Sequence, residues 1–123
     1  MDFLYPIDFE MPIIEDVEMN PGYLKGIIDL VFCHNGKYYI IDWKSNWMGY
    51  SLDDYGLAGM QRCMVEHRYD LQASLYKEAL RRYLENIVDV SFEEVYGGTY
   101  YIFLRGVDPQ TSSSNGVFNF EKI

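Results

Sequence analysis

Residues 23–44 read YLKGIIDLVFCHNGKYYIIDWK, in which two β-rich runs are joined by the dipeptide Asn35-Gly36. Asn-Gly is the strongest short-range signal for a two-residue hairpin, because a type I′ turn needs a positive φ at both central positions. The sequence therefore predicts a β-hairpin formed by residues 23–34 and 37–43.

The turn also fixes how the two runs pair. Counted outward from the turn, pairing brings Asp29 opposite Asp42 as a non-hydrogen-bonded pair, whose Cα atoms lie roughly 4.5 Å apart. Side chains alternate along a strand, so Lys44 points to the same face as Asp42. We therefore expect Asp29, Asp42 and Lys44 to converge on one patch.

Two facing carboxylates repel each other, and both aspartates lie in runs otherwise rich in large apolar residues, GIIDLVF and YYIIDWK. A fold tolerates such a pair if it shares a proton, meets a cation or binds a metal. Lys44 is one such cation, so a purely structural Asp–Asp–Lys cluster stays open. A hard divalent ion also fits, since Mg²⁺ usually takes one or two carboxylates together with water and phosphate.

Two helices are expected after the hairpin. Ser51 with Asp54 resembles a capping box, which opens a first helix at about residues 52–66. Whether this helix continues into the next as one bent helix is left open. The second is expected at about residues 69–85, because one stripe repeats at i, i+4 spacing through Leu71, Leu75, Ala79 and Tyr83.

The remaining strands are expected at the two ends of the chain. Residues 3–8 (FLYPID) are typical of a short edge strand, since Pro6 cannot donate to a sheet interior. Residues 9–22 are acidic and read as a loop. Gly97-Gly98 is expected to break the chain before a final strand at residues 99–104. The order β, hairpin, helices, β predicts an α/β fold with a small mixed sheet around a central β-hairpin.

The composition fits a single domain. The chain has 123 residues, of which 49% are hydrophobic, so it can bury a core. No apolar run approaches the roughly 18–20 residues that cross a membrane, and the acidic start lacks the basic region of a signal peptide, so a cytoplasmic location without membrane contact is expected. Cys33 and Cys63 form no C-x-x-C pair and are expected as reduced thiols, with a disulfide left open.

The net charge of −9 argues against a self-sufficient nucleic-acid binder, because duplex affinity comes mainly from Lys and Arg. The start of the chain is the most acidic part, since no Lys or Arg precedes Lys25. Action on DNA would therefore need metal ions and a partner surface to supply positive charge. No G-x-x-x-x-G-K-[ST] run is present, so the chain is not itself an ATPase.

The sequence resembles a known nuclease family. GIIDLVF, the hairpin and then IDWKSN are similar to the D…D-x-K motif of the PD-(D/E)xK, restriction-endonuclease-like nucleases. Four ordered blocks are similar to the C-terminal nuclease domains of the RecB type, from the beta chain of exodeoxyribonuclease V: YLKGIIDLVF, YYIIDWKSNW, HRYDLQxxLY and GGxYYIFLRGVD. The likeness covers about residues 3–8 and 22–109. It implies a restriction-endonuclease-like mixed sheet flanked by helices.

The resemblance also implies roles for individual residues. Asp29 and Asp42 would bind a catalytic Mg²⁺, helped by the backbone carbonyl of Trp43, and Lys44 would orient the attacking water or stabilise the transition state. Gln72 and Tyr76 match the family's Q-x-x-x-Y signature and would contact the DNA strand from one helix face. The implied activity is that of a magnesium-dependent exodeoxyribonuclease.

The resemblance extends to a larger assembly. It implies that the chain is a fragment of a helicase-nuclease chain, acting on DNA with the gamma and alpha chains of an exodeoxyribonuclease V complex in break repair and recombination. The sequence departs from the family pattern in two places: the upstream helix that carries a metal-binding His is missing, and so is the closing C-terminal helix. Another ligand would then come from Glu10, Glu15 or Glu18, unless these are solvated loop carboxylates. A non-catalytic nuclease-like module, serving assembly or DNA binding, is the alternative function.

Several other residues admit two interpretations. Trp43 and Trp47 flank the site strand and serve either packing or base stacking. His67 lies at the helix junction, as a cap or interhelical contact or as a DNA contact. A basic patch on the second helix is either a solvated face or a contact to phosphate or a partner, and consists of Lys77, Arg81 and Arg82.

Overall fold

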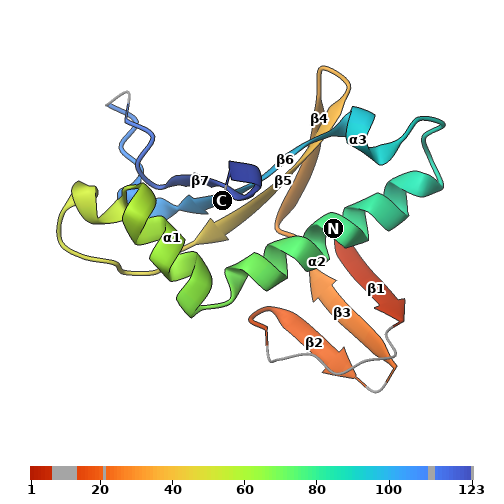
Figure 1. The fold of residues 1–123 in the computed structure, drawn as a ribbon, viewed down its shortest axis with the longest axis horizontal. Coiled ribbons are helices and arrows are strands. Elements are labelled where there is room, and N and C mark those ends of the chain that lie inside the picture. Colours follow the sequence, from red (N-terminus) through yellow and green to blue (C-terminus); the bar gives the residue numbers. More distant parts are fainter. Residues whose placement is uncertain (7–13, 21, 111–112, 123) are drawn as a thin grey trace.

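The computed structural model describes residues 1–6, 14–20, 22–110 and 113–122 of the chain. These residues form two β-sheets and a helical layer (Figure 1). The three-stranded sheet has the order β1-β3-β2 and the four-stranded sheet the order β4-β5-β6-β7. The strands are β1 (Asp2–Pro6), β2 (Val17–Asn20), β3 (Tyr23–Ile27), β4 (Leu30–His34), β5 (Lys37–Lys44), β6 (Tyr96–Phe103) and β7 (Val117–Asn119). The mixed α/β fold expected from the sequence is confirmed.

The predicted hairpin and its register are confirmed. β4 pairs with β5 in antiparallel register from His34 opposite Lys37 to Leu30 opposite Ile41. The turn residue Asn35 has a φ of 51° and Gly36 a φ of 78°, as a type I′ turn requires.

The prediction of a single strand at residues 23–34 was wrong, because these residues form two strands that belong to different sheets. β3 ends at Ile27 and β4 begins at Leu30. Between them, Ile28 is fully buried, and its backbone N–H donates to the carbonyl of Met1 at 2.6 Å. Asp29 therefore lies at the junction of the two sheets, one step beyond the last ladder pair of β4 and β5.

The helices start and end close to the predicted positions. The capping box of Ser51 and Asp54 is present, but it caps a short 3₁₀-helix, η1 (Leu52–Tyr55). Gly56 then takes an extended conformation, so α1 spans only Leu57–Glu66. His67 and a left-handed Arg68 separate α1 from α2 (Tyr69–Glu85), so the two are distinct helices.

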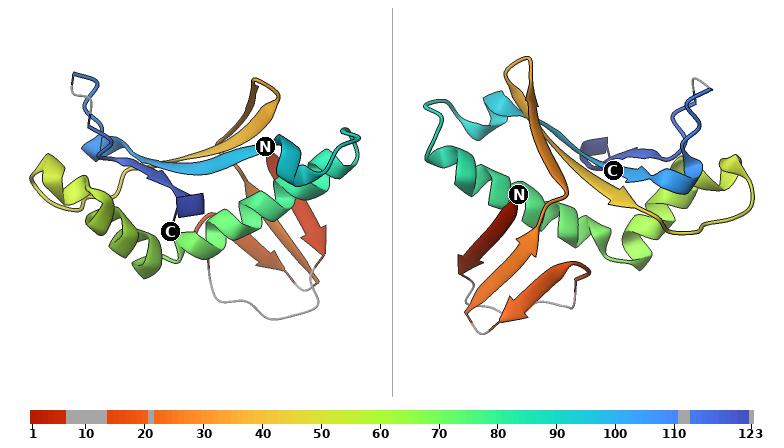
Figure 2. Two further views of the ribbon diagram at one scale, coloured as in Figure 1. Left: turned by 45° about the horizontal axis from the view of Figure 1, so that its top comes forward. Right: turned by 180° about the vertical axis from the view of Figure 1, so that it is seen from behind.

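The buried stripe of α2 is rotated from the predicted one. Leu75 and Ala79 are buried as expected, whereas Tyr83 is exposed and Leu84 takes its place in the core. α2 packs against the three-stranded sheet and against β5, and α1 packs near β6 and β7 (Figures 1 and 2). This arrangement places α2 over the face of β5 to which Asp42 points.

Several elements in the second half of the chain differ from the predicted ones. β6 runs parallel to β5 and contains Gly97-Gly98, so the prediction that these glycines lie outside the strand was wrong. A Cβ on Gly97 would lie 2.4 Å from Cζ of Tyr39, so this glycine gives room to a neighbouring ring. The other unpredicted elements are α3 (Phe92–Val95), η2 (Leu104–Gly106), β7 and η3 (Phe120–Lys122).

The N-terminal predictions were partly right. β1 is an edge strand of its sheet as expected, while residues 7 and 8 lie outside the described residues. The expected loop at residues 9–22 was wrong in part, because β2 falls within it. Glu10 and the rest of 9–13 are outside the described residues.

The cysteines and the helices bear on two further predictions, the state of the thiols and the absence of a membrane span. Both cysteines are free thiols; Cys63 is buried and Cys33 is exposed. Of the helices that the structure describes, none has the length and apolar content needed to cross a membrane.

Candidate active site

The end of β5 carries two of the predicted catalytic residues, Asp42 and Lys44, on the same side of the strand. Asp42 and Lys44 point inward and are only 2% and 6% exposed, whereas Trp43 between them faces outward. This alternation follows from the strand period of two residues and confirms that Asp42 and Lys44 share one face. Charged side chains are rarely this buried unless they are paired.

Lys44 is held by a set of anionic and aromatic groups. Its Nζ lies 3.0 Å from Oδ2 of Asp42 and 3.5 Å from Oδ2 of Asp16. The same ammonium lies 4.1 Å from the ring centroid of Tyr69 and 5.5 Å from that of Tyr101. Both rings present π-electron density to the cation, which offsets part of the cost of burying it.

Burial controls the charge of Asp42. Desolvation raises the pKa of this carboxyl from 3.8 to about 6; the attraction of Lys44 opposes the increase, and repulsion from Asp29 and Asp16 adds to it. The Lys44 ammonium, 3.0 Å away, is the partner of Asp42 Oδ2, which has no other hydrogen-bond donor within the described residues. The carboxylate thus depends on one cation.

Asp29 approaches the same place from the junction between the sheets. It is exposed, and its Oδ2 accepts a hydrogen bond of 2.9 Å from the backbone N–H of Trp43. This bond ties the junction to β5 beside Asp42. Asp29 and Asp42 are close enough for their charges to interact, as the pKa of Asp42 shows.

These residues fit a divalent cation. A buried carboxylate oxygen whose one partner is Lys44, beside a second carboxylate, is a site where positive charge is favourable. Within the described part of the chain, no group of three or more His, Cys, Asp or Glu side chains is arranged to hold a metal. An ion held here would therefore take its remaining ligands from backbone, water or phosphate, as Mg²⁺ commonly does.

A network of side chains that the sequence analysis did not assemble lies next to Lys44. Glu15 contacts Nδ1 of His67 at 3.1 Å and accepts a hydrogen bond of 2.9 Å from the Tyr69 hydroxyl. Partial burial raises the pKa of Glu15, but these two hydrogen bonds outweigh it and lower the pKa overall. The side chain of Asn46 also hydrogen-bonds the Tyr69 hydroxyl.

The network places several residues whose roles the sequence left open. His67 makes the predicted interhelical and capping contacts, because it stacks on Tyr69 and caps α1, while its contact with DNA stays a prediction. Glu15 is held by these partners, and Glu18 is exposed on β2. Tyr69 shares a helix face with Gln72, a spacing that was visible in the sequence. Asp16 lies in a segment whose position no local pattern fixes.

Gln72 and Tyr76 lie under the site and are both fully buried. Gln72 donates to the backbone carbonyl of Glu15 at 2.7 Å and accepts a hydrogen bond of 2.6 Å from the Tyr101 hydroxyl. Neither Gln72 nor Tyr76 presents a surface to solvent in this structure. Their contact with DNA therefore stays a prediction, while the visible role of Gln72 is to fix the Glu15 segment to α2.

Replacing Gln72 by Leu is expected to lower the free energy of unfolding by about 1–3 kcal/mol, because it leaves the Glu15 carbonyl without its donor and weakens the pairing of Tyr101. Urea denaturation of both proteins measures the change. Gln61→Leu, on the half-buried surface of α1, is the matched control. Equal midpoints and slopes for wild type and Gln72→Leu would show that the buried pairing adds no stability.

The basic patch on α2 is neutralised by neighbouring acids. Lys77 pairs with Glu121, and Arg81 pairs with Glu78 and Glu85. Arg82 also pairs with Glu78. The structure favours a solvated, internally paired face.

The chain belongs to the PD-(D/E)XK nuclease superfamily, whose family model matches residues 3–117. It is similar to RecBCD enzyme subunit RecB of Escherichia coli (strain K12), with 47% identity over 106 residues, covering 85% of this chain and 9% of that protein. Similar proteins of the same name occur in Haemophilus influenzae, with 43% identity over 82% of this chain and 8% of that protein, and in Buchnera aphidicola subsp. Baizongia pistaciae, with 41% identity over 79% and 8%. The chain spans about a tenth or less of the length of these relatives. The resemblance stated from the motifs is confirmed.

Proposed function

We propose that this domain is a magnesium-dependent DNA nuclease, with Asp29, Asp42 and Lys44 as its catalytic residues. The observation that carries the proposal is the convergence of a buried, poorly satisfied Asp42, the tethered Asp29 and a buried Lys44 at the end of β5. A structural cluster would gain the hydrogen bond from Trp43 to Asp29, but the second carboxylate also adds repulsion beside the buried one, and a bound cation would relieve it. Membership of a nuclease superfamily supports the same interpretation.

The residues divide the chemical work among them. Asp29 and Asp42 would hold Mg²⁺ together with the Trp43 carbonyl. The ion, when bound, activates water and neutralises charge on the scissile phosphate. Lys44 keeps its ammonium fixed by Asp42, Asp16 and Tyr69, so a cation is already in place where negative charge develops. Burial in a region of low dielectric strengthens this effect.

The substrate and the assembly follow from the charge of the chain and from its relatives. A net charge of −9 gives the domain little attraction for duplex DNA, so we propose that single-stranded DNA is delivered to it by a larger assembly. The relatives named as RecB are subunits of an enzyme named RecBCD. We propose the same setting here: a domain of a helicase-nuclease chain that acts beside the gamma and alpha chains of an exodeoxyribonuclease V.

Cleavage of an end-labelled single-stranded oligonucleotide by the chain tests the nuclease function. Product is expected with Mg²⁺ or Mn²⁺ and none with EDTA, because two carboxylates without an ion provide no positive charge for the phosphate. The same assay with duplex DNA is expected to give less product, because the acidic domain has no means of opening the strands. An absence of product with either ion, from chain whose circular dichroism shows a folded protein, would contradict the proposal.

A further inference from the structure

Three surface hollows adjoin one another at the end of β5. The Asp29 hollow, about 620 Å³, is lined by Asp29, Trp43 and residues of β2 and β3. The Lys44 hollow, about 320 Å³, is lined by Lys44 and the segments on either side of it. Asp16 and Trp43 line both hollows, so the two are neighbours.

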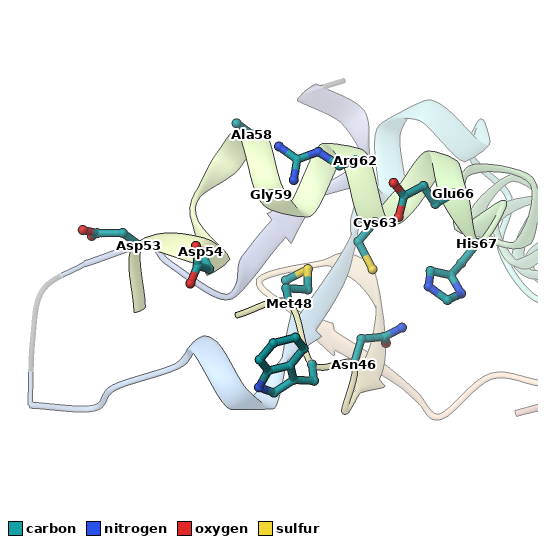
Figure 3. Close-up of a pocket in the computed structure, with 11 residues that line it drawn as sticks. Asn46, Met48, Asp53, Asp54, Ala58, Gly59, Arg62, Cys63, Glu66 and His67 are labelled. Atoms are coloured by element: carbon teal, nitrogen blue, oxygen red, sulfur yellow. The ribbon is translucent and has the colours of Figure 1, made fainter. Parts of the chain in front are cut away.

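The third hollow, the Trp47 cleft, lies beyond the Lys44 hollow, on the side away from Asp29. It measures about 370 Å³ and opens between α1 and the segment that contains Asn46, Trp47 and Met48. In Figure 3, Cys63 and His67 point from α1 and its end toward this segment. Asn46 lines both the Lys44 hollow and the Trp47 cleft. A volume in the roughly 300–1,000 Å³ range is typical of sites for small organic groups.

The segment beside the cleft carries an exposed aromatic pair, of which Trp47 lines the cleft. Trp47 is 58% exposed and Tyr50 is 98% exposed, with their rings 5.1 Å apart in an edge-to-face arrangement. Leaving an indole in water costs free energy that burial would recover. An exposed aromatic face next to a nucleic-acid track is a platform on which any base can stack.

The charges around the cleft decide which part of a nucleotide enters it. Asp53, Asp54 and Glu66 line the cleft, against a single Arg62. A phosphate inside it would meet net negative charge, whereas an uncharged base would not. Arg62 is exposed and has no hydrogen bond or ion pair to another residue in the part of the chain that the structure describes, so it is free to meet a phosphate at the rim.

We propose that the Trp47 cleft holds one nucleobase of a single-stranded DNA substrate, stacked on Trp47, beside the phosphate cleaved at Asp29, Asp42 and Lys44. This inference rests on the proposed nuclease function and adds a subsite to it. The base enters the cleft, the backbone passes Arg62, and the shared residue Asn46 connects the subsite to the Lys44 hollow. Stacking depends little on base identity, so the subsite grips a strand without selecting its sequence.

Binding measured in EDTA tests the subsite without cleavage. A fluorescent thymidine oligonucleotide is titrated at moderate ionic strength, because the acidic chain repels DNA and salt screens that repulsion. Trp47→Ala is expected to weaken binding about tenfold, within the range for loss of one stacked base, and Trp47→Phe to stay within about threefold of wild type. Tyr83→Ala, an exposed aromatic on α2 that lines none of the three hollows, is the matched control and is expected to bind like wild type.

The two tryptophans of the chain provide a direct readout. In Trp43→Phe the remaining indole is Trp47, and its fluorescence is expected to be quenched when the oligonucleotide binds. Quenching in Trp43→Phe that disappears when a single-stranded abasic sugar–phosphate chain replaces the oligonucleotide supports stacking of a base. Equal quenching by the abasic chain would overturn it.

An abasic scan in the cleavage assay places the subsite relative to the cut. One abasic nucleotide is moved along the oligonucleotide, and the cleavage positions are mapped with Mg²⁺. In wild type, cleavage is expected to be suppressed at a fixed distance from the abasic position. In Trp47→Ala, no such suppression of cleavage is expected. If Trp47→Ala binds and cuts like wild type, the proposal fails. If wild type does not cleave, the nuclease function fails, while the binding comparison in EDTA still decides the subsite.

Discussion

Replacement of Asp42 by Asn is expected to lower metal-dependent cleavage of single-stranded DNA by about a thousandfold or more. Asp42 is the buried member of the carboxylate pair, so its loss removes the ligand that the ion would bind most strongly. A metal contributes several kcal/mol to the stability of the transition state, and each 1.36 kcal/mol corresponds to roughly a factor of ten in rate. Single-turnover cleavage measures the loss. Asp89→Asn, on an exposed turn away from the three hollows, is the control, and near-normal cleavage by Asp42→Asn would rule out the proposed metal site.

The same substitution separates folding from catalysis through pH. The pKa of Asp42 is raised in the folded protein to about 6 from 3.8, so the folded state holds this proton more tightly than the unfolded state. The resulting stabilisation is fully present below about pH 4 and is lost as the pH rises through about 6. Relative to Asp42→Asn, wild type is therefore expected to lose stability between pH 4 and pH 7. Urea denaturation in EDTA across this range measures the difference, and parallel curves would contradict the raised pKa.

Replacement of Lys44 by Met is expected to reduce turnover by about 10²–10³, on the scale of losing one preorganised transition-state contact. Binding of Mn²⁺ is expected to survive or tighten, because a cation has been removed from beside Asp42 and Asp16. Calorimetric titration of Mn²⁺ and single-turnover rates measure the two effects separately. Lys77→Met, whose ammonium pairs with Glu121 on the surface, is the control. Unchanged turnover would refute the catalytic role of Lys44, and loss of metal binding would assign it to holding the site.

Lys44→Met is also expected to be destabilised in EDTA, by roughly 3 kcal/mol, because it leaves a buried carboxylate without its cation. Saturating Mn²⁺ is expected to restore most of this loss, since binding to the folded state alone stabilises it. Thermal unfolding with and without the ion makes the comparison. A variant that the ion does not rescue would show that Lys44 supports the fold in a way that no ion replaces.

The central hairpin and the positions of Asp42 and Lys44 on it were predictable because their geometry is local. Asn35-Gly36 sets the register through turn chemistry alone, and strand alternation then places Asp42 and Lys44 on one face. The division of residues 23–34 at Ile28 was not predictable. An apolar run reads the same whether it stays in one sheet or passes into another, and only tertiary packing decides between the two.

The rest of the site depends on contacts between distant segments. Asp16 reaches Lys44, and Glu15 reaches His67, across more than a fifth of the chain, and no spacing rule links these residues. β6 is parallel to β5, so no turn sets its register. Gly97 is required because the ring of Tyr39 leaves no room for a Cβ atom at this position. β7 is short, and its inward Phe118 gives little periodicity to detect.

The junction at Ile28 and Asp29 has a mechanical consequence. β3 and β4 belong to different sheets and are joined by these two residues, so Asp29 lies on the link between the sheets, whereas Asp42 lies within the four-stranded one. The hydrogen bond from the Trp43 N–H to Asp29 and the ion pair between Lys44 and Asp16 both connect β5 to the side of the three-stranded sheet. A change in the angle between the two sheets is therefore expected to change the distance between the Asp29 and Asp42 carboxylates. These are the proposed ligands of the ion, so the relative orientation of the sheets would affect metal binding.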